Sequence, residues 1–306
     1  MSTLSSRSIL QSLLIAFFLY EPIKGLRVHS KTTTSSIKTT VNSRYVRKIP
    51  FLQSSKQINR RRNLFQMWGA GLLSSILLPV ADARSLSPVD ASTAYDSYAP
   101  TYDKLDGGLA SFALGIDEAR SQLFQKAHGR VLEIGVGTGL NLSKYNLEKV
   151  TSLTLVDISE GMIQQAKDRL ATMKATIPVT FIQADATSQL VDTFGENAFD
   201  TVVDSFSLCV METEGAKSCI SQLSKVVKPK TSGGQILLLE NSRSSNSALG
   251  WYQDLTASAA AVVGGKGCIY NQNVRELIMQ AHDVIIENER QYFAGLFRAF
   301  ECTKKV

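Results

Sequence analysis

The sequence predicts an α/β fold, in which a mostly parallel sheet of seven strands has an antiparallel last strand and helices on both faces. Short apolar runs rich in β-branched residues alternate with helical patterns along residues 85–306, as in consecutive strand–helix–strand units. Three glycines at alternate positions directly follow the first run. The last two runs are too close together for a crossover helix, so we expect them to pair antiparallel.

The seven expected strands are short and rich in Val, Ile, Leu and Thr. They cover residues 130–134, 152–156, 179–183, 199–205, 235–240, 284–290 and 296–303. Helices are expected to begin near Asn141 and near Ile158, and a further helix should run from about Thr213 to Val227. Lys228-Pro229 ends that last helix, because proline cannot continue it. In such sheets the ligand binds at the carboxyl ends of the strands, where the strand order reverses.

The first 84 residues differ in composition from the rest of the chain. They hold 13 Lys and Arg but only two acidic residues, a net charge of +11; because the whole chain carries +6, residues 85–306 carry −5. The basic character therefore belongs to a leader. The acidic balance of residues 85–306 argues against nucleic-acid binding, and their length suits one domain.

The leader divides into three segments. Residues 1–25 contain an apolar run of signal-peptide length, and residues 26–62 are Ser/Thr-rich, basic and transit-like. Residues 63–83 follow three arginines and end on Ala-Asp-Ala, which predicts a twin-arginine-type signal, with a membrane anchor as the alternative. This series resembles the leaders of plastid proteins and predicts a plastid location, in the thylakoid lumen or membrane. A mitochondrial inner-membrane location is the alternative.

The four cysteines form no CxxC pair and have no histidine at metal-ligand spacing, so we expect no metal site. We expect Cys209, Cys219, Cys268 and Cys302 to be small apolar residues of the core.

The glycine-rich loop predicts a nucleoside-binding site. Gly135, Gly137 and Gly139 follow the first strand and let the backbone turn tightly and approach a ligand. Leu140 stands where the dinucleotide-binding fingerprint has its last glycine or alanine, and the Gly-Lys-Ser/Thr of a P-loop is absent. The pattern therefore favours a ligand without a phosphate and disfavours a nicotinamide-dependent oxidoreductase.

Acidic residues at the ends of the first three strands complete this site. Glu133 is expected to orient the loop and to reach a ligand ammonium through water; the alternative is an acid exposed to solvent. Asp157 can accept both hydroxyls of a ribose, or it can cap a helix. Asp185 and the N–H of Ala186 can bind an adenine ring, although an aspartate after a strand is often a turn residue.

Five sequence blocks occur in the order and spacing of one enzyme family: LEIGVGTGLNL, LVDISEGMI, QADA, FDTVVDSFSLC and KPKTSGGQILLLEN. On these blocks the chain resembles the class I S-adenosylmethionine-dependent methyltransferases, which have a Rossmann-like fold. Tyr95-Asp96-x-x-Ala99-x-x-Tyr102-Asp103 is similar to the segment that precedes the glycine loop in ubiquinone/menaquinone-type methyltransferases. GVGTGLNL is also similar to the phospholipid N-methyltransferase-like (methyltransferase type 11) group.

The resemblance implies S-adenosyl-L-methionine as the cofactor and methyl transfer as the reaction. The acceptor would be a small molecule or lipid, apolar or membrane-associated, such as a quinone, a prenylated phenol or a lipid headgroup. The alternative is a non-catalytic S-adenosylmethionine-binding assembly factor in an organelle. The expected cofactor-binding residues are Tyr102, Glu133, Gly135, Gly137, Gly139, Asp157, Ile158, Asp185, Ala186 and Ser205. Tyr102, with Tyr98 as a second candidate, would close over the methionyl carboxylate.

Fewer sequence signals mark the acceptor side of the site. The sequence also predicts no particular oligomeric state. Methyl transfer from a sulfonium requires alignment more than a base, and only Asp204, Glu240 and Asn241, at the ends of strands four and five, are weak catalytic candidates. We expect the insertion at residues 243–270, with Trp251, to form a lid over an apolar pocket or a helix on the sheet edge. His282 is expected in a structural turn.

Overall fold

The computed structural model describes residues 88–103, 115–173, 175–263 and 267–305. Every described residue belongs to one compact unit of the chain. The three segments of the predicted leader lie outside the described residues, so the leader stays a prediction. Within the described ranges, no helix is both long and apolar enough to cross a membrane.

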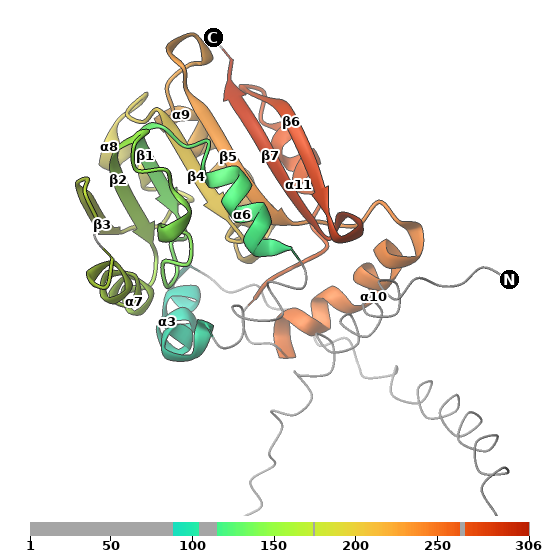
Figure 1. Cartoon of the computed structure of the whole chain (residues 1–306). Helices are drawn as coiled ribbons and strands as arrows, with labels where there is room; N and C mark the ends of the chain where they lie inside the picture. The colour runs from blue at the N-terminus through green and yellow to red at the C-terminus, as the bar shows by residue number, and fades with distance from the viewer. Residues whose placement is uncertain (1–87, 104–114, 174, 264–266, 306) are drawn as a thin grey trace, which may run out of the picture. The chain divides into compact units, whose positions relative to one another are not determined.

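The core of the fold is a seven-stranded sheet in the order β3-β2-β1-β4-β5-β7-β6 (Figure 1). The strands are β1 Gly129–Ile134, β2 Val150–Asp157, β3 Val179–Gln183, β4 Thr201–Ser205, β5 Gln235–Asn241, β6 Val284–Tyr292 and β7 Phe297–Lys304. Strands β1 to β5 are parallel, and β7 is antiparallel to both β5 and β6. The predicted fold class is confirmed. The strand order reverses between β1 and β4, which places their carboxyl ends at the crevice where such sheets bind ligands.

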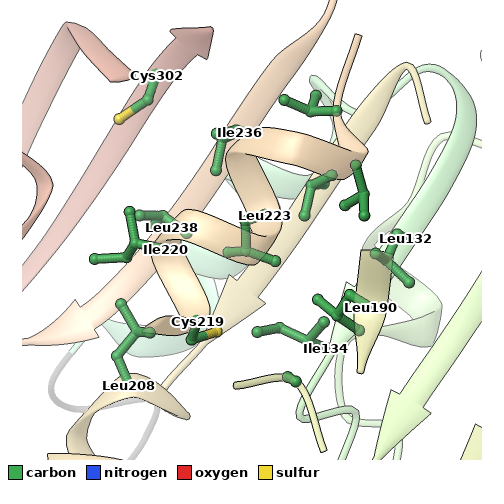
Figure 2. Packing of buried hydrophobic residues seen from close by; sticks show 14 of the residues in the cluster. Leu132, Ile134, Leu190, Leu208, Cys219, Ile220, Leu223, Ile236, Leu238 and Cys302 are labelled. Atoms are coloured by element: carbon green, nitrogen blue, oxygen red, sulfur yellow. The ribbon is translucent and has the colours of Figure 1, made fainter. Parts of the chain in front are cut away.

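Helices cover both faces of the sheet. The α-helices are α3 Pro88–Tyr98, α6 Ile116–Phe124, α7 Glu160–Ala171, α8 Leu190–Phe194, α9 Glu212–Val226, α10 Ser247–Val263 and α11 Val274–Gln280. Alternate residues of each strand enter opposite cores, so Val131 packs with α6 and α7, whereas Leu132 packs with α8, α9 and α11. Figure 2 shows the second core, in which Leu223 of α9 lies near Ile236 and Leu238 of β5.

The predicted helix near Asn141 is wrong. A single 3-10 turn, Leu142–Lys144, is the only helical element between the glycine loop and β2 in this described stretch. Leu142 and Tyr145 are buried, and the side chains of Asn141 and Tyr145 donate hydrogen bonds to Glu133 of β1. These contacts fasten the segment to the strand and determine its path in place of a regular helix.

The other helix boundaries agree with their sequence signals. Helix α7 begins after Ser159, whose hydroxyl accepts a hydrogen bond from the N–H of Met162. Helix α9 ends at Val226, three residues before Pro229. His282 is exposed in the turn between α11 and β6, as expected for a structural position.

Candidate cofactor site

A cavity of about 310 Å³ lies at the carboxyl ends of β1 to β4. Its walls come from α3 and the stretch after it, the glycine loop, the ends of β2 to β4, and the loop that leads from β4 into α9. The lining residues are Ala91, Tyr95, Tyr102, Gly135, Gly137, Val156, Asp157, Ile158, Met162, Ala184, Asp185, Ala186, Thr187, Ser205, Phe206, Ser207, Val210, Met211, Glu212 and Gly215. Eight of the ten expected cofactor-binding residues are among them; Glu133 and Gly139 are not.

The glycine loop leaves room for a ligand at one position. Gly135, Gly137 and Gly139 have φ angles of +56°, +55° and +79°, a region that favours glycine. A Cβ on Gly135 would lie 2.5 Å from the Cβ of Ser207, and one on Gly139 would lie 2.8 Å from Leu142. At Gly137 the nearest atom would be 4.0 Å away. Packing therefore requires glycine at the first and third positions, whereas Gly137 borders open space in the cavity.

Asp157 joins the end of β2 to the glycine loop. Its Oδ2 accepts a hydrogen bond from the N–H of Gly137 at 2.8 Å, and its Oδ1 accepts one from the N–H of Ser159 at 3.0 Å. Burial raises the pKa of this carboxyl to about 6, although the two backbone bonds favour the ionised form. Each oxygen keeps a further lone pair, so the carboxylate can hold the loop and accept from a ligand hydroxyl.

Glu133 lies behind the loop rather than on the cavity wall. It is fully buried and accepts hydrogen bonds from Asn141 Nδ2 and from the hydroxyl of Tyr145, both at 2.7 Å. Burial raises its pKa to about 7. Asn141 Nδ2 also donates to Ser205 Oγ at 2.8 Å, which connects the loop to β4. This position supports the expected role of Glu133 in orienting the loop. The side chain is not exposed to solvent, and it does not line the cavity.

Asp185 organises the turn after β3 and also lines the cavity. Its Oδ1 accepts hydrogen bonds from the N–H and the hydroxyl of Thr187, at 2.8 and 2.7 Å. Asp185 is therefore a turn residue, as one interpretation of the sequence expects, and it also borders the cavity, as the adenine-binding interpretation requires. Contact of Asp185 and Ala186 with an adenine stays a prediction.

Two aspartates fasten the amino-terminal wall of the cavity. Asp96 of α3 accepts hydrogen bonds from the hydroxyl of Ser159 at 2.6 Å and the N–H of Gly161 at 2.9 Å. Asp103 pairs with Arg169 of α7 and accepts from the hydroxyl of Thr138 at 2.5 Å. Neither aspartate was an expected site residue, although both belong to the tyrosine-aspartate motif. Their seven-residue spacing within that motif is the signal that could have identified them.

The tyrosines of this segment divide between lining and packing. Tyr95 and Tyr102 line the cavity, with ring centroids 6.5 Å apart. Tyr98 is not a lining residue, and its ring packs edge-on against Tyr95 at 6.1 Å. The structure thus favours the packing role for Tyr98, and Tyr95 takes the second lining position.

The loop after β4 contributes residues that the sequence analysis missed. Phe206 and Glu212 both line the cavity with positive φ angles, +59° and +56°. For residues other than glycine this conformation costs about 1–3 kcal/mol and is common at functional sites. No local sequence signal marks these two positions, because their conformation is imposed by the packing around them.

The three weak catalytic candidates are not among the residues that line the cavity, and a catalytic role for them stays a prediction. Asp204 and Glu240 are fully buried beneath the loop after β4, and Asn241 is half-buried away from the lining. Glu240 Oε1 accepts from the N–H of Ser207 at 3.1 Å, and Asp204 Oδ1 accepts from its hydroxyl at 2.5 Å. Burial, together with the nearby Asp204 carboxylate, raises the pKa of Glu240 well above its usual range. This pair supports the loop from below.

For the insertion around Trp251, the structure favours the packed helix over the lid. Residues of the insertion form α10, in which Trp251 is 64% exposed and does not line the cavity. Gln253 of the same helix is buried, accepts from the N–H of Ser244 and donates to the carbonyls of Ser242 and Tyr270. The alternative interpretation, a helix packed at the sheet edge, fits these contacts. In contrast to α10, helix α3 contributes Ala91 and Tyr95 to the lining of the cavity.

Comparison with known proteins agrees with this geometry. Residues 131–230 match the family model described as "Methyltransferase domain". The chain is 24% identical over 215 residues to the mitochondrial methyltransferase OMS1 of Saccharomyces cerevisiae, an alignment covering 66% of this chain and 44% of that protein. It is 30% identical over 170 residues to the ubiquinone/menaquinone biosynthesis C-methyltransferase UbiE of Pseudomonas fluorescens, covering 54% and 61%. The chain thus spans about half the length of these curated relatives.

The fold recurs in a solved structure of similar architecture. An O-methyltransferase family protein from Burkholderia thailandensis superposes with a TM-score of 0.54 at 16% identity, over 79% of this chain and 70% of that one. The resemblance drawn from the sequence blocks is confirmed. The residues 131–230 that match the methyltransferase-domain model include the glycine loop, Asp157 and Asp185.

Proposed function

We propose that this chain transfers a methyl group from S-adenosyl-L-methionine to a small acceptor that is apolar or membrane-associated. The observation that carries the proposal is a single cavity that has both a polar wall and an apolar wall. The glycine loop and Asp157 form one wall, and Tyr95, Phe206 and Met211 contribute an apolar surface opposite the strand ends. A bound cofactor and a flat apolar acceptor can share such a space.

The residues present fit the cofactor. Gly137 leaves open space where any side chain would intrude, and Asp157 keeps acceptor capacity toward that space. Within the part of the chain that the structure describes, the lining includes the acids Asp157, Asp185 and Glu212 but no Lys, Arg or His. A negative wall favours a ligand that carries an ammonium and a sulfonium. When bound, S-adenosylmethionine supplies an electrophilic methyl group and a good leaving group.

The task of the protein is then to align the acceptor and to exclude water. Tyr95 and Tyr102 close the amino-terminal side, and the loop from Phe206 to Glu212 closes the opposite side. Because no cationic side chain is among the described residues that line the cavity, we propose a neutral or cationic reacting group on the acceptor. A quinone, a prenylated phenol or a headgroup amine meets this condition, whereas a phosphate close to the reacting atom does not.

A second candidate function is cofactor binding without turnover, as in an organellar assembly factor. One observation favours it: Asp204, Glu240 and Asn241 do not reach the cavity. Methyl transfer from a sulfonium requires no general base, so this observation does not decide between the two functions.

The deciding experiment uses the full chain and has two steps. Calorimetry should show binding of S-adenosylmethionine and of S-adenosylhomocysteine, with no binding of NAD. Radiolabelled cofactor is then incubated with an organellar lipid extract, and labelled lipid is separated by chromatography. Labelled product supports the enzyme. Cofactor binding without labelled product, across quinone, phenol and amine lipid fractions, supports the assembly factor, and absence of binding contradicts both.

We further propose that the protein acts in an organelle. The composition of residues 1–84 supports a plastid route, and the similarity to a mitochondrial yeast protein supports the mitochondrial alternative. Fractionation of plastids and mitochondria with an antibody to residues 267–305 should find the protein in one of them. Mass spectrometry of its first residue should give a start near Arg84 for a cleaved signal. A start near Leu26 with Arg60–Arg62 retained would contradict the lumenal route.

A further inference from the structure

Two cysteines from distant parts of the chain lie side by side next to the cavity. Cys209 belongs to the 3-10 turn Leu208–Val210 after β4, and Cys268 follows α10. Their sulfur atoms are 2.6 Å apart, a separation little longer than the ~2.05 Å of a disulfide bond. We propose that Cys209 and Cys268 are a redox pair that forms a reversible disulfide between these two segments.

The backbone around the pair is already in position for a bond. The N–H of Ile269 donates to the carbonyl of Cys209 at 2.8 Å, so the two segments adjoin without any movement. Asn241 Nδ2 also lies within 3.5 Å of the Cys209 sulfur and 3.3 Å of the Cys268 sulfur. One backbone hydrogen bond and the shared contact with Asn241 therefore keep the two thiols close together, as a disulfide requires.

The two thiols differ in their exposure to solvent and should therefore have different roles in a thiol–disulfide exchange. Cys268 is half-buried, whereas Cys209 is buried. The hydrogen bond with Cys268, followed by burial, raises the pKa of Cys209 well above its usual range, so Cys209 stays protonated until it reacts. Cys268 is thus the thiol that an external oxidant reaches first, and Cys209 is the thiol that resolves the product.

The oxidant would be a low-molecular-weight or protein disulfide. The Cys268 thiolate attacks one sulfur of that disulfide, a new S–S bond forms, and one thiolate leaves. Cys209 loses its proton and displaces the second thiol from Cys268, which forms the Cys209–Cys268 bond. In sum, the two protein thiols lose two protons and two electrons, and one oxidant disulfide takes them up and becomes two thiols.

The bond would join the acceptor side of the cavity to the segment after α10. Val210, the next residue after Cys209, lines the cavity. The two cysteines are 59 positions apart, so the closed loop is long and its loss of freedom in the unfolded chain should stabilise the fold. The redox state of the compartment would then set the stability of the cavity wall.

The test measures the bond directly in the full chain. The protein is reduced with dithiothreitol, exchanged into glutathione disulfide, blocked with N-ethylmaleimide during denaturation, and digested with trypsin. Cleavage after Lys217, Lys266 and Arg275 separates the four cysteines except for the proposed link. We expect a linked Cys209–Cys268 peptide pair, two hydrogens lighter than the free peptides. We also expect the oxidised protein to melt at least about 5 °C higher than the reduced one, reversibly.

Two variants complete the design. Cys268→Ser should abolish the linked peptide and the melting shift, and the buried Cys219→Ser, a matched control, should keep both. Recovery of Cys209 and Cys268 as separate maleimide adducts after oxidation would overturn the proposal. So would glutathione on Cys268 without a link to Cys209. Both readouts on the natural sequence hold even where a variant fails to fold.

Discussion

The two sides of the cavity are built in different ways. On the cofactor side, the N–H of Gly137 in the glycine loop donates a hydrogen bond to the side-chain carboxylate of Asp157 at the end of the neighbouring strand β2. On the acceptor side, the loop from Phe206 to Glu212 has two non-glycine residues at positive φ and rests on the buried Asp204–Glu240 pair. The first side repeats a short motif, whereas the second depends on long-range packing. This difference teaches that cofactor recognition can be read from local sequence and that acceptor recognition cannot.

Of these substitutions, Gly137→Val, on the cofactor side, should have the largest effect. A branched side chain would occupy open cavity space and could not adopt a φ of +55° without strain, so cofactor affinity should fall at least about 100-fold. The matched control is Gly195→Val, at a φ of +77° with no atom within 4 Å of the new Cβ and no part in the cavity. Calorimetry should show normal affinity for the control. Equal losses in both variants would mean that strain, and not occupied space, is responsible.

Asp157 tests whether the carboxylate binds the ligand in its ionised form. Asp157→Ala should weaken S-adenosylhomocysteine binding at least about tenfold, since charge-assisted hydrogen bonds contribute about 1.5–3 kcal/mol each. Exposed Asp168 of α7 is the control, and Asp168→Ala should leave the affinity unchanged. Undiminished binding by the Asp157 variant would contradict the ribose assignment.

The pH dependence of ligand affinity in the unsubstituted protein also tests whether Asp157 binds in its ionised form. Because the pKa of Asp157 is raised to about 6, the carboxyl is ionised at pH 7.5 and mostly protonated at pH 5. Affinity for S-adenosylhomocysteine should therefore fall about tenfold over that interval as pH decreases. Asp157→Asn should remove the dependence. A dependence that persists in this variant would point to Glu133 or Asp204, whose raised pKa values of about 7 and 6 lie in the same range.

Glu240 should affect stability and not turnover. Glu240→Ala leaves the buried N–H of Ser207 without an acceptor, so the free energy of unfolding should decrease by about 2–4 kcal/mol. Glu240→Gln keeps an acceptor oxygen and should cost less than about 1 kcal/mol. Thermal unfolding and kcat/KM measured side by side decide the role. A large loss of kcat in a stable Gln variant would restore Glu240 as a catalytic residue.

Trp251 should have the smallest effect. Because its side chain is 64% exposed and outside the cavity, Trp251→Ala should change cofactor affinity and turnover of a soluble acceptor by less than about twofold. Gln253→Ala in the same helix should instead lower the melting temperature, since Gln253 is buried and bonded to three backbone groups. Reduced turnover in a fully stable Trp251 variant would instead support a lid formed by the insertion at residues 243–270.

The sequence by itself determined the sheet and the cofactor side. Strand periodicity and the positive φ angles of the three glycines follow from local backbone rules. Asp157 reaches the N–H of Gly137 because β1 and β2 are adjacent parallel strands whose carboxyl ends lie together. Tertiary structure decided which of the remaining polar residues reach the cavity. Glu133, Asp204 and Glu240 stand at strand ends, as expected, but lie behind the wall because the loops after these strands fold over them. Phe206 and Glu212 reach the cavity through backbone conformations that only the surrounding packing can impose.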